Sequence, residues 1–311
     1  MTSRNPLIGA AMVLSGVTMW GVGSLFMRFM LGDGLAPAQI SLYANSITLA
    51  IMVVGLVAFA PRFLPIPIKS LPLLLAVGAV GPGFAGLCYS TSIASTSLSL
   101  ATVLLYTSPA WVTLLAWRFL GEPIGLRRAG AVVAAVIGVA LVAEAYDPAA
   151  LSGSIIGILF GIAGGFGYAV FIVLSKTALR RHHPLTVTTY AYMSATLVTI
   201  PLQQSLPPAA FPSSSLIWLG LYVLCSQLLG NVAYNSGLRR TPAGLVSILA
   251  LWSPIATLSL SAIVLGEALG PLQILGALFV IGSVAAMRPG RDPREAPATT
   301  PAPAGAPARA G

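Results

Sequence analysis

Residues 89–122 read YSTSIASTSLSLATVLLYTSPAWVTLLAWRFLGE, and the same pattern returns 145 positions later, in residues 234–267, as YNSGLRRTPAGLVSILALWSPIATLSLSAIVLGE. The two stretches align without a gap and share ten identities in 34 positions. Most other positions pair one apolar residue with another, so composition explains some identities. The pairs Ser108-Pro109 and Ser253-Pro254, and the Leu-Gly-Glu triplets that end both stretches, are harder to attribute to composition. The chain therefore contains two related halves.

Composition indicates a membrane protein. The 311 residues are 57% hydrophobic and only 7% charged, whereas soluble domains carry about 25% charged residues. A soluble fold could not keep this much apolar surface away from water, so lipid must be the solvent. Related halves in so hydrophobic a chain are typical of transporters built by duplication. A static membrane scaffold is the alternative, but it has no need of this symmetry.

Charge and cysteine content exclude other classes. The net charge of +9 could suggest nucleic-acid binding, but the basic residues lie in short loops between apolar segments, so no nucleic-acid partner is expected. Cys88 and Cys225 lie in apolar segments at positions that the repeat does not relate. We interpret both as core residues and expect no disulfide. No cofactor and no metal site are predicted.

Ten segments are long enough to cross a bilayer, which takes about 20 mainly apolar residues. The first is expected to be retained, because it lacks a convincing cleavage site of the kind that ends a signal peptide. The tail, residues 288–311, is rich in proline and alanine and is expected to be disordered on the cytoplasmic side. The ten predicted spans are 7–30, 37–60, 70–91, 98–119, 125–143, 153–175, 185–204, 214–236, 243–264 and 270–287.

The positions of lysine and arginine set the orientation. Ten spans leave both termini on one side, and placing that side in the cytoplasm puts 15 of the 16 basic residues there. Only Arg28 then falls outside. Each half holds five spans, an odd number, so the second half is inverted relative to the first. The sequence predicts an all-α inner-membrane protein of two inverted five-helix repeats, 1–147 and 148–287.

Prolines and glycines mark backbone features within the spans. Pro109 and Pro254 occupy equivalent positions in the fourth and ninth spans, where proline kinks a helix, and we interpret them as hinges or as packing kinks. Gly81-Pro82-Gly83 could break the third span but has no sequence counterpart in the other half. Glycines recur every fourth residue on the sixth span, as a stripe for close packing or for sliding between the halves: Gly153, Gly157, Gly161 and Gly165.

Neutral polar residues are the candidates for contact with a solute. Gln227, Asn231 and Asn235 are four apart and share one face of the eighth span. Because unpaired polar groups in hydrocarbon cost several kcal/mol, this stripe either bonds to a neighbouring helix or faces a cavity. Gln227 and Asn231 are the better candidates, since Asn235 is near the span end.

Acidic residues and histidines avoid the middle of every span. Proton-coupled carriers usually keep an ionisable residue in the membrane, so we expect facilitative transport driven by the substrate's own gradient, or a form of coupling that the sequence does not reveal. Arg28 either snorkels to the outer surface or offers a positive site for a carboxylate. The sequence lacks His-Glu-x-x-His and Gly-x-Ser-x-Gly motifs and any filter-like repeat, which argues against an enzyme and against a channel.

Together these residues resemble the drug/metabolite transporter superfamily, in its ten-span branch with two EamA-type repeats. Each repeat there begins with an aromatic-small motif, here Trp20-Gly21-Val22-Gly23 and Gly167-Tyr168-Ala169. Each also carries a Ser-Pro pair within its fourth helix and a Gly-Glu pair at the end of that helix. The latter pairs are Gly121-Glu122 and Gly266-Glu267. The resemblance covers about residues 7 to 287.

The resemblance implies a basket of helices around a central cavity, lined by helices one, three, four, six, eight and nine. It also implies export of amino acids or other small metabolites, and homodimers through the fifth and tenth helices. Aromatic residues on the cavity helices can stack on a solute or attract its ammonium group. The candidate substrate contacts are therefore Trp20, Tyr89, Tyr106, Tyr168, Gln227, Asn231 and Trp252.

The alternatives concern single residues and the substrate class. Tyr89 lies near a span end, where anchoring at the membrane interface is the other reading. Amino acids are favoured as substrates, with aromatic amino acids and threonine or homoserine as examples. A multidrug exporter, another metabolite exporter and a nucleotide-sugar carrier are the alternatives. The spans contain neither the embedded glutamate of small multidrug carriers nor the basic cluster that a nucleotide sugar should need.

Overall fold

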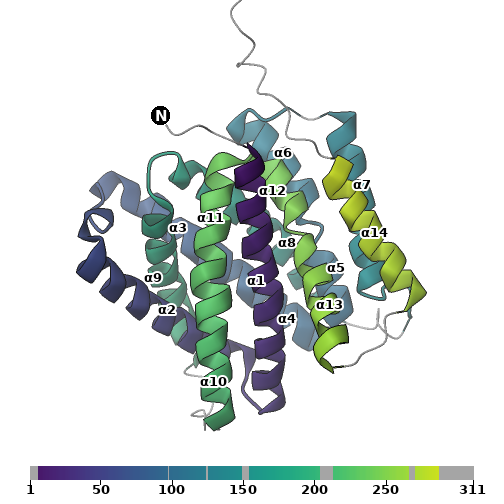
Figure 1. Cartoon of the computed structure of the whole chain (residues 1–311), viewed down its shortest axis with the longest axis horizontal. Helices are drawn as coiled ribbons and strands as arrows, with labels where there is room; N and C mark the ends of the chain where they lie inside the picture. Colours follow the sequence, from purple (N-terminus) through teal and green to yellow (C-terminus); the bar gives the residue numbers. More distant parts are fainter. Residues whose placement is uncertain are drawn as a thin grey trace, which may run out of the picture.

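The computed structural model describes residues 6–96, 98–123, 125–148, 154–203, 213–265 and 270–286. Within these ranges every regular element is a helix, which confirms the all-α fold class (Figure 1). Gly153, Gly266, Glu267 and the tail from residue 287 lie outside the described residues.

The first half contains α1 (Pro6–Gly32), α2 (Pro37–Phe59), the 3₁₀ turns η1 (Pro61–Phe63) and η2 (Ile68–Ser70), α3 (Leu71–Gly78), the π-helical segment η3 (Ala79–Ala85), α4 (Gly86–Ser95), α5 (Leu98–Leu105), α6 (Ser108–Leu120) and α7 (Leu126–Val142). The second half contains α8 (Ile155–Leu179), α9 (Pro184–Gln203), α10 (Ser213–Tyr222), the π-helical segment η4 (Val223–Gly230), α11 (Asn231–Arg240), α12 (Ala243–Leu249), α13 (Trp252–Leu265) and α14 (Pro271–Ala286).

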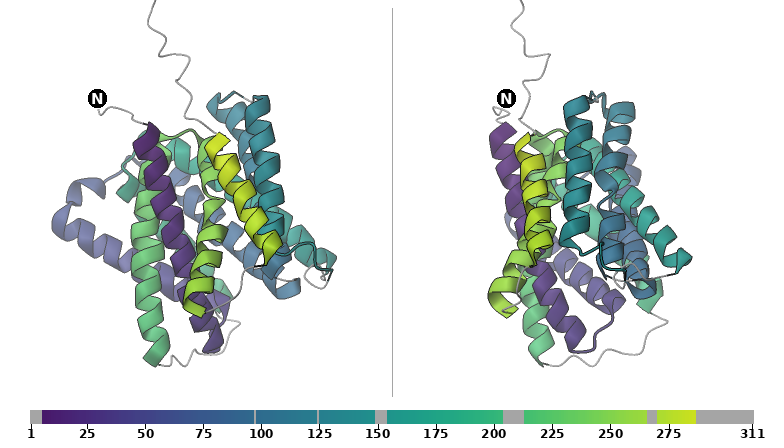
Figure 2. Two further views of the ribbon diagram at one scale, coloured as in Figure 1. Left: turned by 45° about the vertical axis from the view of Figure 1, so that its right-hand side comes forward. Right: turned by 90° about the vertical axis from the view of Figure 1, so that its right-hand side faces the viewer.

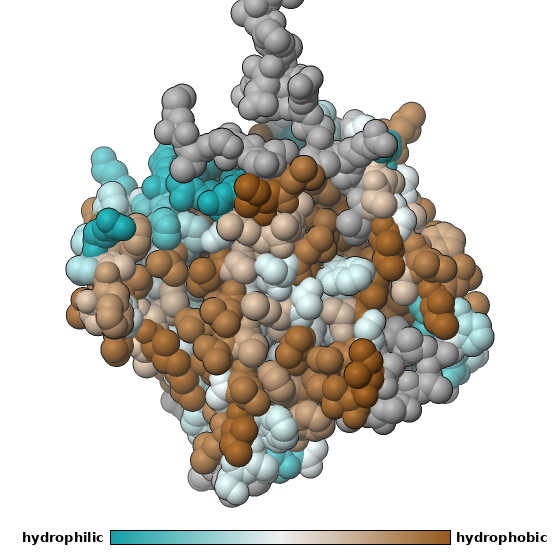
Figure 3. All heavy atoms as spheres, viewed as in Figure 1, coloured by the Kyte–Doolittle hydropathy of each residue, from teal (hydrophilic) through white to brown (hydrophobic). Residues whose placement is uncertain are grey.

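Length and apolar composition make this a multi-pass membrane protein. Six described helical segments are long and apolar enough to cross a membrane: Leu7–Gly32, Ala38–Phe59, Ile68–Tyr89, Val103–Leu120, Ile155–Leu179 and Ser213–Arg240. Shorter apolar helices follow within α7, α12–α13 and α14. Large apolar side chains such as Val54, Leu278 and Ile263 are exposed. Hydrophobic residues cover the middle of the molecule, while hydrophilic ones gather at its upper left edge (Figure 3). Lipid accounts for such a band.

Both predicted proline kinks are breaks between two helices. α5 ends at Leu105 and α6 begins at Ser108, which leaves Pro109 in the first turn of α6. α12 ends at Leu249 and α13 begins at Trp252, so Pro254 also lies in a first turn. Proline is tolerated there because the N–H that it lacks would have no partner within the helix. Neither proline therefore kinks a continuous helix, and each starts a new one.

The two π-helical segments occupy equivalent positions in the two halves. A shift of 145 places η3 (Ala79–Ala85) on residues 224–230, and η4 spans Val223–Gly230. Pro82 lies inside η3, whereas η4 has no proline. Gly81-Pro82-Gly83 thus has no counterpart in sequence but does have one in backbone structure. Single π-helical turns are rare and often occur at functional sites.

The halves interleave. α1 packs mainly against second-half elements, namely α11, α13 and η4, and α8 packs mainly against the first-half elements α4, α5 and α6. α2 and α3 lie against α9, and α7 packs along α14 at the right-hand edge of the molecule (Figures 1 and 2). Close approach of α1 to α11 depends on Gly16, where a Cβ would lie 2.8 Å from the backbone nitrogen of Tyr234. The arrangement leaves a cavity between elements of both halves.

Candidate functional site

A cavity of about 290 Å³ lies between helices of both halves. First-half elements contribute residues from α1, η3, α4 and α5, and second-half elements contribute residues from α8, α9, α10, η4 and α11. No Asp, Glu, His, Lys or Arg is among the described lining residues. Five of the seven predicted substrate contacts line it, namely Trp20, Tyr89, Tyr168, Gln227 and Asn231.

One wall is aromatic. Trp20 comes from α1, Tyr89 from α4, and Tyr168 and Phe171 from α8. The Trp20 ring packs against the buried ring of Tyr234 with centroids 4.5 Å apart, which fixes the indole in place. The rings of Tyr168 and Phe171 are 5.9 Å apart at an interplanar angle of 27°. Rigid rings of this kind offer faces for a ring or for a cation.

The other wall is an amide and hydroxyl network. The Tyr192 hydroxyl on α9 donates to Oε1 of Gln227 at 2.7 Å, and Nδ2 of Asn231 donates to that hydroxyl at 2.7 Å. Nε2 of Gln227 in turn donates to Oδ1 of Asn45 on α2 at 3.2 Å. Sequence reasoning left open whether the amide stripe bonds to neighbouring helices or faces a cavity. It does both, since Gln227 and Asn231 also line the cavity.

Asn235 extends this polar wall. It is 4% exposed, and its Nδ2 donates to Oγ1 of Thr188 on α9 at 3.0 Å. Its Oδ1 is buried and has no hydrogen-bond partner among the described residues. Asn235 and Thr188 both line the cavity. The sequence analysis ranked Asn235 below the other two amides because of its place near the span end.

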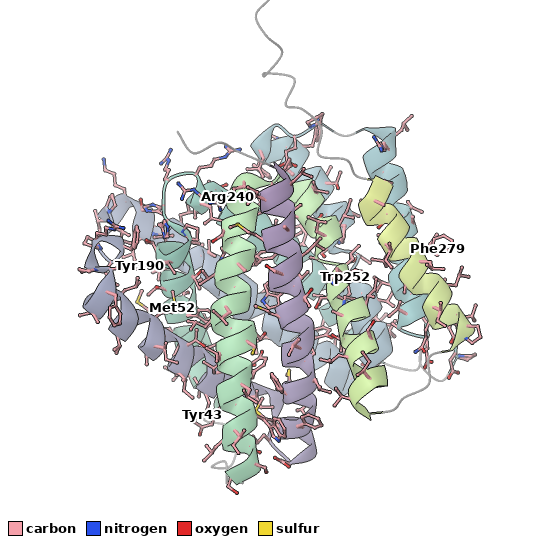
Figure 4. The ribbon with its side chains drawn as sticks, in the orientation of Figure 1. Tyr43, Met52, Tyr190, Arg240, Trp252 and Phe279 are labelled. Atoms are coloured by element: carbon pink, nitrogen blue, oxygen red, sulfur yellow. The ribbon has the colours of Figure 1, made fainter. Side chains whose placement is uncertain are left out.

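Tyr106 and Trp252 lie outside the cavity lining. Trp252, the first residue of α13, donates its indole N–H to Oγ1 of Thr18 at 3.1 Å (Figure 4). Tyr106 packs with Trp252 against a buried cluster that includes Leu251 and Ile255. The ninth predicted span therefore supplies none of the described lining residues, and α9, the seventh, supplies Thr188 and Tyr192 instead.

Sequence reasoning missed Tyr192, Thr188 and Phe171 as lining residues. Thr188 and Tyr192 are four apart, so they share a face of an otherwise apolar helix. This polar pair was the available signal, but the family pattern directed attention away from the seventh helix. Phe171 carries no signal that separates it from an ordinary core residue.

The glycine stripe of α8 packs against the first half. A Cβ on Gly161 would lie 2.6 Å from Cδ1 of Leu104, and one on Gly165 would lie 2.8 Å from the carbonyl oxygen of Leu104. Gly157 faces Ser95 and Thr96 at the end of α4 in the same way. The stripe therefore brings the backbone of α8 close to α4 and α5. Whether this surface also slides remains a prediction.

Two charged side chains hold the junction between α11 and α12. The Glu122 carboxylate, after α6, accepts hydrogen bonds from the backbone N–H groups of Ala243 at 2.6 Å and Gly244 at 3.1 Å. Nζ of Lys176 on α8 donates to the carbonyl oxygens of Leu238 and Thr241, both at 2.6 Å. An anion at a helix N-terminus and a cation at a helix C-terminus both match the helix dipole. All seven residues of α12 are buried.

Interleaved halves around a central cavity define the class of multi-pass membrane carriers. The chain belongs to the EamA-like transporter family, whose model matches residues 7–143 and 155–288. This match confirms the resemblance drawn from the motifs. The two matched segments fall in the two related halves.

Relatives carry transporter names. An uncharacterized transporter of Archaeoglobus fulgidus is 29% identical over 276 residues, which cover 88% of this chain and 94% of that protein. A probable terminal-alkyne amino-acid exporter of Streptantibioticus cattleyicolor is 28% identical and covers 94% of this chain and 96% of its own length. The pseudopaline exporter of Pseudomonas aeruginosa is 28% identical over 58% of this chain and 62% of its own.

A solved structure shares the fold. It is described only as the crystal structure of a protein, and it superposes on this chain with a TM-score of 0.77 at 14% identity. The match covers 89% of this chain and 95% of that one. At this identity the likeness concerns the fold alone.

Proposed function

We propose that this protein exports small neutral or zwitterionic metabolites, with amino acids as the first substrate class. The cavity is the observation that carries the proposal. Its volume of about 290 Å³ is at the lower end of the roughly 300–1,000 Å³ of small-molecule pockets. Its described lining combines aromatic rings with amides and hydroxyls and contains no charged side chain. Such a site suits a solute without net charge, because a buried charge without a partner is costly.

The relatives support the same class. The Streptantibioticus protein, which aligns along nearly its whole length, is named a probable terminal-alkyne amino-acid exporter. A multidrug or nucleotide-sugar carrier is the alternative. An acidic lining would favour a multidrug carrier and a basic lining a nucleotide-sugar carrier. The described lining residues include neither acidic nor basic side chains.

The proposed mechanism is alternating access by two inverted five-helix repeats, in an inner-membrane protein with ten spans and both termini in the cytoplasm. α12 is entirely buried, whereas several residues of its counterpart α5, such as Leu100 and Val103, are partly exposed. This difference supports a state closed at the end held by Glu122 and Lys176. In the proposed orientation that end is cytoplasmic, so release into the cytoplasm would require α12 to leave those contacts.

Apolar outer faces of α7 and α14 support a homodimer through the fifth and tenth spans. Val133, Ile137 and Leu278 are exposed there, and they would contact either lipid or a second copy. The bilayer and the small-molecule substrate are the other proposed partners.

Counterflow in proteoliposomes tests the function. Purified protein would be reconstituted and assayed with a panel of radiolabelled amino acids, with and without a pH gradient. Saturable exchange that needs no gradient is the expected result. We expect Trp20→Ala, in the aromatic wall, to lower exchange at least tenfold. Trp252→Ala is the matched control outside the lining and should retain exchange within a few-fold of wild type.

Other results would redirect the proposal. Exchange that occurs only with a pH gradient would contradict the facilitative mechanism. Failure to exchange any amino acid would move the substrate to another class of metabolite. Equal losses in the two tryptophan variants would contradict a special role of the cavity.

A further inference from the structure

We propose that Asn231 receives the ammonium group of the substrate on its side-chain oxygen. The inference rests on the proposed function and deepens it, because it fixes the direction in which a zwitterion lies in the cavity. Asn231 is then a residue that determines specificity for solutes with an amino group.

Hydrogen bonds fix the orientation of the Asn231 amide. Its Nδ2 donates to the Tyr192 hydroxyl at 2.7 Å and to the carbonyl oxygen of Ser226 at 3.2 Å. The hydroxyl has one proton, which goes to Gln227, whose Oε1 lies at 2.7 Å and whose carbonyl oxygen lies at 3.0 Å. Toward Asn231 the hydroxyl can therefore only accept, as can the Ser226 carbonyl. A turned amide would place Oδ1 against that carbonyl oxygen, so Oδ1 faces away from the network.

The side-chain oxygen of Asn231 is open to a solute. Oδ1 accepts no hydrogen bond from the described residues, whereas Nδ2 makes the two bonds above. Asn231 is partly exposed and lines the cavity, and its Oδ1 is not among the fully buried polar atoms without a partner. Asn235, one turn further along, differs in this respect, because its Oδ1 is fully buried. Asn231 thus presents an acceptor that is both fixed and within reach.

The chemistry of this acceptor selects the group that it binds. An amide oxygen accepts hydrogen bonds and repels a carboxylate, whereas an ammonium has three donors and no acceptor. The rings of Tyr168 and Phe171 also line the cavity, and ring faces attract a cation. Because no acidic side chain is among the described lining residues, an ammonium would meet neutral oxygens and ring faces there.

A donor for the carboxylate lies on the same cavity. A Cβ on Gly230 would lie 3.2 Å from Nε1 of Trp20, so the indole edge packs against the residue that precedes Asn231. An indole N–H can only donate, and that of Trp20 has no acceptor within the described ranges. An amino acid carries both charged groups on one carbon, so an acceptor on Asn231 and a donor on Trp20 match it.

The test compares three solutes, using the full-length protein. L-phenylalanine carries both charged groups, 3-phenylpropionate lacks the ammonium, and 2-phenylethylamine lacks the carboxylate. Counterflow competition in proteoliposomes gives their relative affinities, and intrinsic tryptophan fluorescence of the purified protein gives binding without transport. Wild type should bind 3-phenylpropionate at least 30-fold more weakly than phenylalanine, because a site built for a donor rejects an analogue without it.

Two variants then give opposite signs. Asn231→Leu should weaken phenylalanine at least tenfold and leave 3-phenylpropionate within twofold, whereas a merely structural loss would weaken both acids alike. Asn231→Asp has nearly the same shape and should strengthen 2-phenylethylamine at least tenfold, since a carboxylate pairs with the ammonium. It also keeps the test valid if the leucine variant does not fold.

Asn45→Leu is the matched control. Asn45 is a buried amide outside the described lining, and it bonds to the same network through Gln227. Its loss should preserve the ratio between phenylalanine and 3-phenylpropionate.

The contrary outcomes are distinct. If Asn231→Asp weakens the amine, or if Asn231→Leu leaves the ratio of the two acids as in wild type, the placement of the ammonium is wrong although the amino-acid function stands. If wild type does not carry phenylalanine, L-threonine replaces it, with 3-hydroxybutyrate and 1-aminopropan-2-ol as its analogues. If wild type carries neither amino acid, the proposed function fails and this inference fails with it.

Discussion

Glu122 is a side chain of the first half that stabilises a helix of the second. Its carboxylate bonds to two backbone N–H groups at the start of α12. Hydrogen bonds to charged groups contribute about 1.5–3 kcal/mol. Glutamine keeps the shape but removes the charge and one acceptor, so we expect Glu122→Gln to lower the free energy of unfolding by about 1–2 kcal/mol.

A fall of several degrees in Tm, followed by tryptophan fluorescence in detergent, would report this loss. The exposed Glu144 offers a matched control, and Glu144→Gln should leave Tm nearly unchanged. Equal Tm values for wild type and Glu122→Gln would contradict the stabilising role.

His183, between α8 and α9, should make stability depend on pH. Its ring stacks on Phe63 with centroids 4.1 Å apart. Burial first, and then the charges of Arg239, Arg62 and Arg240, lower the pKa of His183 from its ordinary value of 6.5. The neutral ring therefore contributes stability above about pH 6.5, and this is lost as the pH falls through the lower pKa of the folded protein.

We expect Tm to fall between pH 7.5 and pH 5 and the fall to be smaller in His183→Gln. The comparison isolates this histidine from other groups that titrate in the same range. An identical pH profile in the variant would show that His183 does not contribute.

At the scale of elements, the glycine stripe of α8 sets its distance from α4 and α5. A leucine at Gly161 would place Cβ 2.6 Å from Cδ1 of Leu104 and 2.9 Å from Oγ of Ser92, so the helices would have to separate. Overpacking typically costs about 1–3 kcal/mol, and we expect Gly161→Leu to lower both Tm and transport. Gly220 on α10 has open space around it, and Gly220→Leu should do neither. Full transport in Gly161→Leu would contradict close packing there.

Element boundaries show what sequence could and could not predict. The internal repeat placed Pro109 and Pro254 at equivalent positions of two apolar segments. The hydrophobic pattern alone does not distinguish one kinked helix from two helices separated by a break. The π-helical turn η4 contains no proline or other marker in sequence. Such a turn depends on tertiary packing, which overrides local preference.

The sequence also predicted only part of the candidate site, because tertiary packing decides the rest. Helical spacing placed Gln227 and Asn231 on one face, and both line the cavity. Which neighbouring helix supplies their partners depends on tertiary arrangement. Tyr192 and Asn45 were therefore not identified. Trp252 was expected at the cavity, but none of the described lining residues comes from α13.

At the scale of the whole molecule, the orientation can be tested by labelling. Ser214, near the start of α10, is exposed and bonds to Asp33, and the topology predicts that it lies on the side of the membrane opposite the cytoplasm. Arg181, between α8 and α9, is also exposed and is predicted to lie in the cytoplasm. In a background without native cysteines, a membrane-impermeant maleimide should label Ser214→Cys in intact cells.

Arg181→Cys should react only after the membrane is permeabilised. The reverse pattern would invert the orientation, and labelling of both positions in intact cells would contradict the count of spans between them. The basic residues predict this orientation from sequence. The interleaving of α1 with the second half follows from long-range packing, which no local pattern records.

The paired π-helical segments also bear on how the chain arose. A π-helical turn closes its hydrogen bonds one residue later than an α-helical turn does, so it holds one residue more. η3 and η4 each contain this extra residue, and they lie at equivalent positions of the two halves. Two independent insertions would have had to occur at the same helical turn in both halves. We infer that one insertion preceded the duplication and was copied with it, which would make the surplus residue older than the pairing of the two halves.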